Sequence, residues 1–509
     1  MNKKILYFVL IAAISVLPFI ILNVSLLDII FSVPSLFSFL FDNFFPPNWN
    51  ALDGNFIIVR NTILFAIVGT CISALLAFFL GILISEYFNP FVPIRLLARF
   101  FVSFLRNVPI IIFASILVFI FGIGPLIGVI ALVLGGVGFL ARSYANNMDE
   151  LAQSKLEALK STGASYFQII FHGLFPAFTP AWLNWTLFAF EINIRISAVL
   201  GMVGAGGLGL LIQANLDLRN FRRAMALIIL LMAIVLIVEF FVNKLRERLE
   251  KGLPYVPIIA FIIVIFFISA SALNLNFQTF IQRLSNAPRI LAHFAIFDFS
   301  VAPELLAALF TSILLGLAGL VLGAVFSFIL TFFAAKNTAP SLTIKFSKYE
   351  LNLNFLPFLI KGAIALLRAI PSLVIILMII ASLGFGYIAA VLGIAFSSLG
   401  YLTKAFIASV EEQEEAKIEA LKSTGASHIQ VIYHGILPAV SSVFWRWISL
   451  RLEFNISDSI SLGVVGAGGI GMLLARAIRQ SNFSYIATGV FIIFIAMFIL
   501  ELIIDKLRN

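Results

Sequence analysis

Uninterrupted runs of apolar residues dominate the hydropathy pattern of this chain. Examples are residues 5–26, 57–84, 224–242 and 488–504. A helix needs about 20 apolar residues to cross the hydrocarbon core of a bilayer, and these runs are long enough. The strands of a membrane β-barrel would instead alternate over segments of about 10 residues. The pattern therefore predicts an all-α, polytopic membrane protein.

The chain consists of two copies of one sequence repeat. The nine residues from Glu157 to Ser165 recur unchanged from Glu419 to Ser427, which is a spacing of 262 residues. The same spacing relates Arg106 to Arg368, Pro109 to Pro371, Pro176 to Pro438, Glu191 to Glu453 and Lys244 to Lys506. Upstream the spacing is 250, from Gly69 to Gly319, so the second copy holds twelve extra residues near 336–349. We therefore predict two domains, residues 1–253 and 254–509.

Each copy is predicted to hold six membrane helices. In the first copy they lie near residues 5–27, 57–84, 108–121, 125–145, 177–200 and 224–242. In the second they lie near residues 255–273, 304–333, 370–383, 387–405, 439–462 and 485–504. An even number of spans makes the copies parallel and returns both chain ends to one side, predicted to be the cytoplasm. Segments 28–56 and 274–303 are rich in Pro, Asn and aromatic residues, and we expect extracytoplasmic loops with interfacial anchors there.

Composition and charge agree with this topology. The 509 residues are 62% hydrophobic and 11% charged, whereas soluble domains are about half apolar and a quarter charged. Most of the 33 Lys and Arg residues fall in segments assigned to the cytoplasm, as the positive-inside bias requires. Topology therefore explains the net charge of +9. We expect contact with membrane lipid and none with nucleic acid.

A polar loop interrupts the apolar pattern at the same place in each copy, over residues 149–176 and 411–438. Each loop opens with a charged, helix-favouring stretch, breaks at Gly163 or Gly425, and ends at Pro176 or Pro438. This order predicts a short cytoplasmic helix, a turn, and a proline in the first turn of the next membrane helix. Because a repeated helix outside the bilayer needs a role, we expect it to dock into a groove of a partner.

The two loops resemble the segment by which type I ABC-importer permeases contact their ATPase subunits. The wider sequence resembles the phosphonate-transporter branch of that family, through Leu105-Arg-x-x-Pro109, Phe190-Glu-Ile-Asn-Ile-Arg195 and the motif Gly204-Ala-Gly-Gly-Leu-Gly209. The resemblance covers nearly the whole of both copies. It implies two coupling helices, formed by Glu157, Ala158, Gly163 and Pro176 and by Glu419, Ala420, Gly425 and Pro438. The chain departs from the general motif at Gly173 and Gly435, which replace an aliphatic residue, and at Phe175, which replaces Leu.

The resemblance also implies the partners. We expect two ATP-binding cassette ATPase subunits holding ATP and Mg, an extracytoplasmic substrate-binding protein, and a multi-pass location in the bacterial inner membrane. The chain contains no Walker A sequence and no His, Cys or carboxylate set with metal-ligand spacing. We therefore predict no catalytic residue, cofactor or metal in this chain, which would act as a pseudo-dimer.

A glycine motif follows the fifth helix of each copy. Its members are Gly204, Gly206, Gly207 and Gly209, repeated as Gly466, Gly468, Gly469 and Gly471. The motif also fits the dinucleotide fingerprint, but a membrane helix precedes it and no βαβ unit surrounds it. A tight turn or a close helix approach explains the glycines better. The motif then serves either a gate or binding-protein contact, or packing alone.

Charges inside predicted membrane helices are costly unless they are paired or face water, so they are candidates for a substrate path. Glu191 and Arg195 are four residues apart and able to pair with each other, while Arg446, Arg451 and Glu453 lie on the equivalent second-copy helix. Five further arginines, Arg219, Arg222, Arg223, Arg476 and Arg479, would lie outside. They would form a cationic outer mouth for an oxyanion, or anchor the chain to lipid headgroups.

The function that the resemblance implies is ATP-driven import of a phosphonate-type oxyanion by alternating access. Phosphate, phosphite or methionine are alternative substrates within the same architecture. A secondary transporter or channel without an ATPase is a less favoured alternative, because it would not explain the duplicated loop. A membrane enzyme acting on lipid phosphates would need a catalytic constellation that the sequence does not present.

Overall fold

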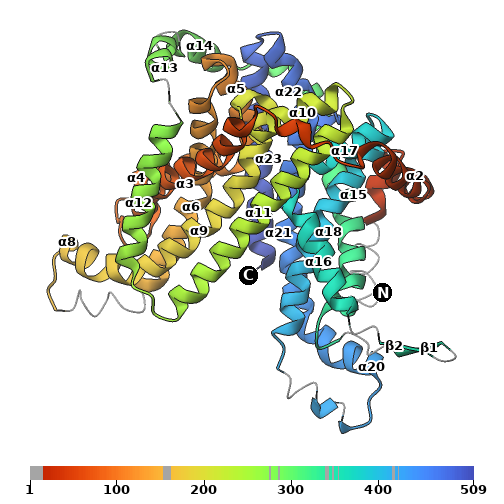
Figure 1. The fold of residues 1–509 in the computed structure, drawn as a ribbon. Helices are drawn as coiled ribbons and strands as arrows, with labels where there is room; N and C mark the ends of the chain where they lie inside the picture. The colour runs from red at the N-terminus through yellow and green to blue at the C-terminus, as the bar shows by residue number, and fades with distance from the viewer. Residues whose placement is uncertain are drawn as a thin grey trace, which may run out of the picture. The chain divides into compact units, whose positions relative to one another are not determined.

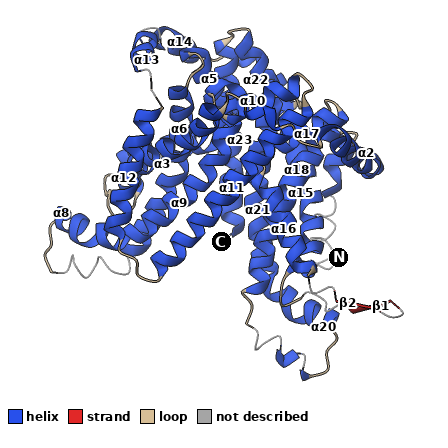
Figure 2. Cartoon of the chain, viewed as in Figure 1, coloured by secondary structure: helices blue, strands red, loops and turns tan. Residues whose placement is uncertain are grey.

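The computed structural model describes residues 15–152, 162–273, 275, 277–284, 287–338, 343–346, 349–352, 355–414, 419–421 and 423–508. Helices make up most of these residues (Figure 2). Ten of the described helices are long and apolar enough to cross a membrane, or up to twelve spans if each of two bent pairs is counted as one. The predicted class, an all-α polytopic membrane protein, is confirmed, with one small β-hairpin added.

The helices of the first copy include the runs predicted at 57–84, 125–145, 177–200 and 224–242. They are α2 (Leu26–Phe44), α3 (Phe56–Ile84), α4 (Val92–Asn107), α5 (Ile110–Phe121), α6 (Pro125–Leu151), α8 (Tyr166–Gln168), α9 (Phe175–Leu200), α10 (Leu208–Asp217) and α11 (Phe221–Glu250). Short 3₁₀ or π-helical segments cover Trp49–Leu52, Ile169–Leu174 and Gly201–Ala205. Residues 15–21 are also helical, and the rest of the predicted first span before them lies outside the described residues.

The second copy repeats this order. It comprises α12 (Tyr255–Ala272), α13 (Phe277–Leu284), α14 (Ala287–Phe294), α15 (Ala302–Ala334), α16 (Leu356–Ala369), α17 (Ser372–Leu383), α18 (Tyr387–Glu411), α20 (His428–Gln430), α21 (Leu437–Val464), α22 (Gly469–Arg479) and α23 (Phe483–Arg508). A π-helical segment covers Val431–Ile436, and a 3₁₀ segment covers Phe299–Val301. Strands β1 (Thr343–Phe346) and β2 (Tyr349–Asn352) pair antiparallel in and just beyond the extra residues of this copy.

Two sequence predictions need correction. Segment 28–56 was expected to be a loop, but α2 occupies most of it: Asp28 and Pro34 are loop signals that the surrounding apolar residues override. Segment 274–303 likewise contains α13 and α14.

The spans expected at 108–121 and 370–383 are the second arms of bent pairs, α4 with α5 and α16 with α17, each bent by 91°. Pro109 and Pro371 stand at the two breaks, because the residue before a proline disfavours the α conformation.

The described chain divides into two compact units that differ from a simple division between the copies. One unit comprises residues 43–302 and 476–498, and the other comprises residues 1–42, 303–475 and 499–509. In the first unit α12 packs against α3, where Arg60 donates a hydrogen bond of 3.2 Å to the carbonyl of Ala272. In the same unit the ring of Phe494 from α23 lies 5.4 Å from that of Phe104 in α4. Each unit therefore includes segments from both copies.

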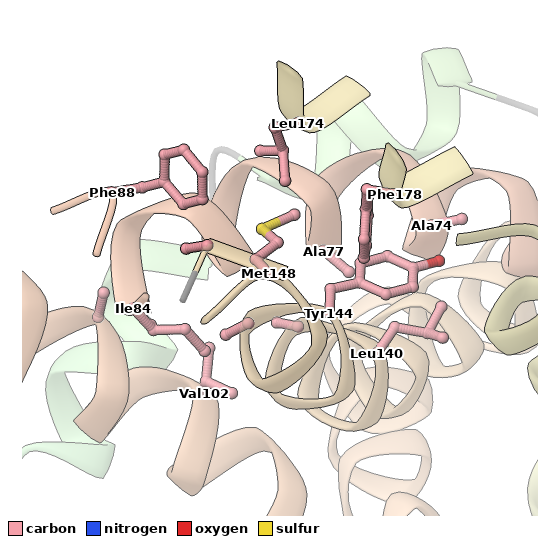
Figure 3. Packing of buried hydrophobic residues seen from close by; sticks show 14 of the residues in the cluster. Ala74, Ala77, Ile84, Phe88, Val102, Leu140, Tyr144, Met148, Leu174 and Phe178 are labelled. Carbon is pink, nitrogen blue, oxygen red and sulfur yellow. The ribbon is translucent and has the colours of Figure 1, made fainter. Parts of the chain in front are cut away.

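The core of the first unit lies where α3, α6 and α9 pack together. Tyr144 and Phe178 meet edge to face at 5.4 Å, with Met148 and Leu174 beside them (Figure 3). The other unit has an equivalent core, in which Phe406 stacks on Phe444 at 4.0 Å. Helices approach closely in both, since small residues such as Gly81 and Gly323 face the neighbouring helix. These rigid bundles position the polar segments at their ends.

The two ends of the first unit carry different short helices. α8 lies at the opposite end of α12 from α13 and α14 (Figure 1). The predicted cytoplasmic segment and the predicted extracytoplasmic segment therefore lie at opposite ends of the same helices, as the proposed topology requires.

Candidate functional site

The two predicted coupling segments fold alike. Gly163 and Gly425 have φ angles of 79° and 80°, which favour glycine, and they turn the chain into α8 and α20. A π-helical segment follows in each copy and leads into the long helix at Pro176 or Pro438. Glu419 and Ala420 are exposed, whereas Glu157 and Ala158 lie outside the described residues.

A capping box starts each short helix. Ser165 Oγ accepts a hydrogen bond of 3.4 Å from the backbone N–H of Gln168, and Gln168 Oε1 accepts one of 2.8 Å from the N–H of Ser165. Ser427 and Gln430 form the same box with the same distances. Reciprocal bonds of this kind satisfy N–H groups that the first turn of a helix leaves without partners. The pattern Ser-x-x-Gln in both copies was the sequence signal for it.

A side chain ties each short helix to the turn that follows α3 or α15. The Tyr166 hydroxyl donates to the carbonyl of Phe88 at 3.0 Å. In the second copy His428 Nε2 is hydrogen-bonded to the carbonyl of Thr338 at 2.8 Å. Phe88 and Thr338 are both buried and lie four residues after α3 and α15. Two different side chains therefore make one equivalent contact, which local sequence patterns did not predict.

A carboxylate holds the other side of each turn. Asp149 accepts hydrogen bonds from Ser85 Oγ at 2.5 Å and from the backbone N–H of Tyr87 at 3.2 Å. The equivalent carboxylate, Glu411, accepts from the N–H of Lys336 at 2.8 Å and from Lys361 Nζ at 2.6 Å. The turn thus links the ends of two membrane helices to the coupling segment. A force applied to that segment would reach both helices.

The glycine motifs form tight turns at the ends of α9 and α21. Positive φ angles occur at Gly204, Gly206, Gly207, Gly466, Gly468 and Gly469, between 71° and 104°. A Cβ atom on Gly209 or Gly471 would overlap the carbonyl of Ala198 or Ile460. Packing therefore accounts for the glycines. The predicted role as a gate or binding-protein contact stays a prediction.

A duplicated hydroxyl fastens each glycine turn to the rest of its copy. Thr62 Oγ1 accepts a hydrogen bond of 2.8 Å from the N–H of Leu208, and the carbonyl of Thr62 accepts one of 3.1 Å from Ser197 Oγ. Ser312 makes the same two contacts, with the N–H of Ile470 at 3.1 Å and with Ser459 Oγ at 2.6 Å. The turn is thus fixed to the second and fifth long helices of its copy.

The intramembrane charges of the first copy form one buried cluster of an arginine and two glutamates. Arg195 Nη2 lies 2.8 Å from Glu191 Oε1 and 3.6 Å from Glu239 Oε2, and all three residues are buried. The pairing of Glu191 with Arg195 was expected. Glu239, on α11, was missed, although its repetition at Glu501 was a signal in the sequence. This cluster joins α9 to α11.

In the second copy, Arg451 occupies a different network, on the side of α21 that faces α18. Its Nη2 atom donates to Ser397 Oγ at 2.8 Å and lies 3.2 Å from Asp458 Oδ2, and its guanidinium lies 4.8 Å from the centre of the Tyr401 ring. Of the other predicted path residues on α21, Arg446 is exposed and Glu453 is half-buried.

Together these features define a duplicated helical membrane protein in which each copy carries the same polar segment. The family model described as binding-protein-dependent transport system inner membrane component matches residues 77–251 and 354–508, once in each copy. The chain therefore belongs to this family: it is a multi-pass permease subunit of an ABC importer, made of two fused copies. In such importers ATP is hydrolysed by a separate subunit.

The chain is also similar to individual proteins of known name. The phosphate-import permease protein PhnE of Mycolicibacterium smegmatis is 27% identical over 469 residues, which are 88% of this chain and 84% of that protein. The phosphite transport system permease protein PtxC of Stutzerimonas stutzeri is 30% identical over 37% of this chain and 69% of its own length. The methionine import system permease protein MetP of Bacillus subtilis is 30% identical over 29% of this chain and 71% of its own. A solved amino acid ABC transporter aligns with 42% of this chain and 97% of its own at 15% identity and a TM-score of 0.35.

Proposed function

We propose that the chain translocates a phosphonate-type oxyanion, with phosphate and phosphite as the nearest alternatives. The similarity along 88% of the chain to a phosphate-import permease carries this proposal. Relatives that transport phosphite support the same substrate class. Methionine is the second candidate, because methionine permeases also match, although over 29% of the chain.

Two ATPase subunits would dock on the two coupling segments, one around Gly163–Pro176 and one around Gly425–Pro438. ATP and Mg would be held by those subunits. When ATP closes them, the movement would pass from each segment to the turn at Phe88 or Thr338 and so to the membrane helices. The helices would then alternate between inward-facing and outward-facing states. An extracytoplasmic binding protein would deliver the substrate, and both chain ends would lie in the cytoplasm of the bacterial cell.

Uptake by the reconstituted importer tests this proposal. The full chain, its ATPase subunits and its binding protein would be placed in proteoliposomes and supplied with labelled methylphosphonate, phosphate, phosphite or methionine. We expect ATP-dependent uptake of an oxyanion and little uptake of methionine. Preferred uptake of methionine would overturn the substrate assignment, and oxyanion uptake without the ATPase subunits would overturn the mechanism.

A further inference from the structure

The surroundings of Arg451 suggest more than a structural ion pair. This residue is 7% exposed and lies about 21 Å from the start of α21, near the middle of that helix. Two serine hydroxyls face its guanidinium: Ser397 Oγ at 2.8 Å from Nη2 and Ser398 Oγ at 3.3 Å from Nε. A buried cation at this depth is costly, and such residues often mark a pathway for a charged solute.

The first copy builds the same helices without this network. At the positions equivalent to Arg451, Tyr401 and Asp458 it has Ala189, Phe139 and Ile196. The two serines are likewise replaced by Gly135 and Gly136. Because α6 packs against α9 in the first copy without these polar groups, the fold itself does not require a cation here. The polar network is a specialised feature of the second copy.

A partly exposed tyrosine and a second arginine lie next to this network. Tyr401 is 38% exposed, and the guanidinium of Arg451 lies over its ring. A second guanidinium, that of Arg368 at the end of α16, lies 5.7 Å from the centre of the same ring. The side chain of Asp458 is 27% exposed. Two guanidinium groups therefore lie against the ring of one partly exposed tyrosine.

We propose that Arg451 binds the oxyanion in the second copy, with Ser397 and Ser398 orienting its guanidinium, and that Asp458 occupies it when no substrate is present. A guanidinium binds carboxylate and phosphonate oxygens in the same planar, two-pronged way. The Asp458 carboxylate would thus be a placeholder that the substrate displaces. This inference rests on the proposed function, because it takes the substrate to be an oxyanion.

The two members of the pair should then respond in opposite directions to substitution. Asp458→Asn removes the competing charge while keeping the shape, and should lower the KM for oxyanion uptake. Arg451→Lys keeps the charge but loses the planar guanidinium. The double variant Arg451→Met/Asp458→Asn loses both charges. Each of these two variants should raise the KM for oxyanion uptake by about tenfold or more. If the pair were structural, Asp458→Asn and Arg451→Lys would lower the melting temperature together and leave KM unchanged.

Tyr144→Phe is a matched control in the first copy. It removes the buried bond of 2.8 Å to Thr186, and the second copy has Phe406 at the equivalent position. Its KM should equal that of the unmodified chain.

If KM shifts in the same direction in Asp458→Asn and Arg451→Lys, or does not shift, the inference is overturned while the proposed function stays intact. If Arg451→Lys fails to accumulate, an unchanged KM for Asp458→Asn alone would overturn it. Absence of oxyanion uptake by the unmodified chain would overturn both.

Discussion

The side chain of Leu421 occupies the space into which a Cβ atom on Gly435 would project. Leu421 lies in the second coupling segment and packs against a core that includes Val431 and Ile436. This contact explains why Gly435 stands where the motif that the chain resembles has an aliphatic residue. Here the two arms of the coupling segment pack directly on each other.

Gly435→Val should therefore destabilise the segment. An extra side chain in a packed site costs about 1–3 kcal/mol, and the displaced Leu421 would weaken docking of the ATPase subunit. We expect reduced uptake and weaker co-purification of the ATPase. The double variant Leu421→Ala/Gly435→Val should recover part of both, because it restores the space. If uptake and ATPase co-purification are no better with the double variant than with Gly435→Val, the contact between Leu421 and Gly435 does not cause the loss.

The turn at Gly425 should tolerate asparagine better than valine. Among the described residues no atom lies within 4 Å of a Cβ placed there, so the penalty comes from the positive φ and not from a clash. The left-handed conformation costs most residues about 1–2 kcal/mol, and less for Asn. An importer that carries Gly425→Val should still hydrolyse ATP through its ATPase subunits but show reduced uptake, while uptake with Gly425→Asn should stay closer to normal. Equal uptake by the two variants would contradict this reason.

Tyr166→Phe should reduce coupling without unfolding the chain. It removes one hydroxyl and with it the bond to the Phe88 carbonyl, worth about 0.5–1.5 kcal/mol. We expect fewer substrate molecules transported per ATP hydrolysed, and a further decrease when His428→Ala is added. Tyr144→Phe is the control, since it also removes one tyrosine hydroxyl bond, that of 2.8 Å to Thr186, outside the coupling segment. An equal decrease in the control would show that the Phe88 contact has no special role.

Arg195→Met should affect stability rather than substrate affinity. It would leave Glu191 and Glu239 buried without the guanidinium between them, and breaking a buried pair in this way costs about 3–5 kcal/mol. Thermal unfolding in detergent should show a large decrease in melting temperature, partly recovered by adding Glu191→Gln. A normal melting temperature with an increased KM would instead support Arg195 as part of the substrate path.

Cysteine labelling can establish on which side the coupling segments lie. Cys71 is the one cysteine of the chain, so Cys71→Ser gives a cysteine-free background. Ser423 is exposed, and Ser423→Cys should react with a membrane-impermeant maleimide in inverted membrane vesicles and not in intact spheroplasts. Labelling in spheroplasts would place the segment outside and contradict the coupling assignment.

Most of the fold could be predicted from the sequence, because membrane spans are long apolar runs and a repeat is visible without a structure. The two repeated polar segments were predicted for the same reason, since a polar stretch repeated between apolar runs is a strong signal, while their coupling role stays a prediction. The bend at Pro109 was missed because the proline was placed inside a span. α2 was missed because Asp28 and Pro34 resemble loop residues, although the segment around them is apolar enough for a helix.

The contacts within the candidate sites were mostly beyond sequence reasoning. Glu191 with Arg195 is a pair at helical spacing, so it was expected. Asp149 with Tyr87, and Arg451 with Ser397, join residues that are 62 and 54 positions apart. Such pairs depend on which helix faces meet, and hydropathy does not determine this in a chain so uniformly apolar. Comparing the two copies position by position is the signal that came nearest, as Glu239 and Glu501 illustrate.

The exchange of segments between the compact units has a consequence for biosynthesis. Phe494 lies against α4, yet about 390 residues separate it from Phe104, and a ribosome adds about 5–20 residues per second. During translation the early helices therefore lie in the bilayer with the surface of α4 that contacts Phe494 uncovered, until residue 494 has been added. A nascent chain released at residue 253 would lack that last piece, so expressing the halves as separate polypeptides should succeed only when both are made in the same cell.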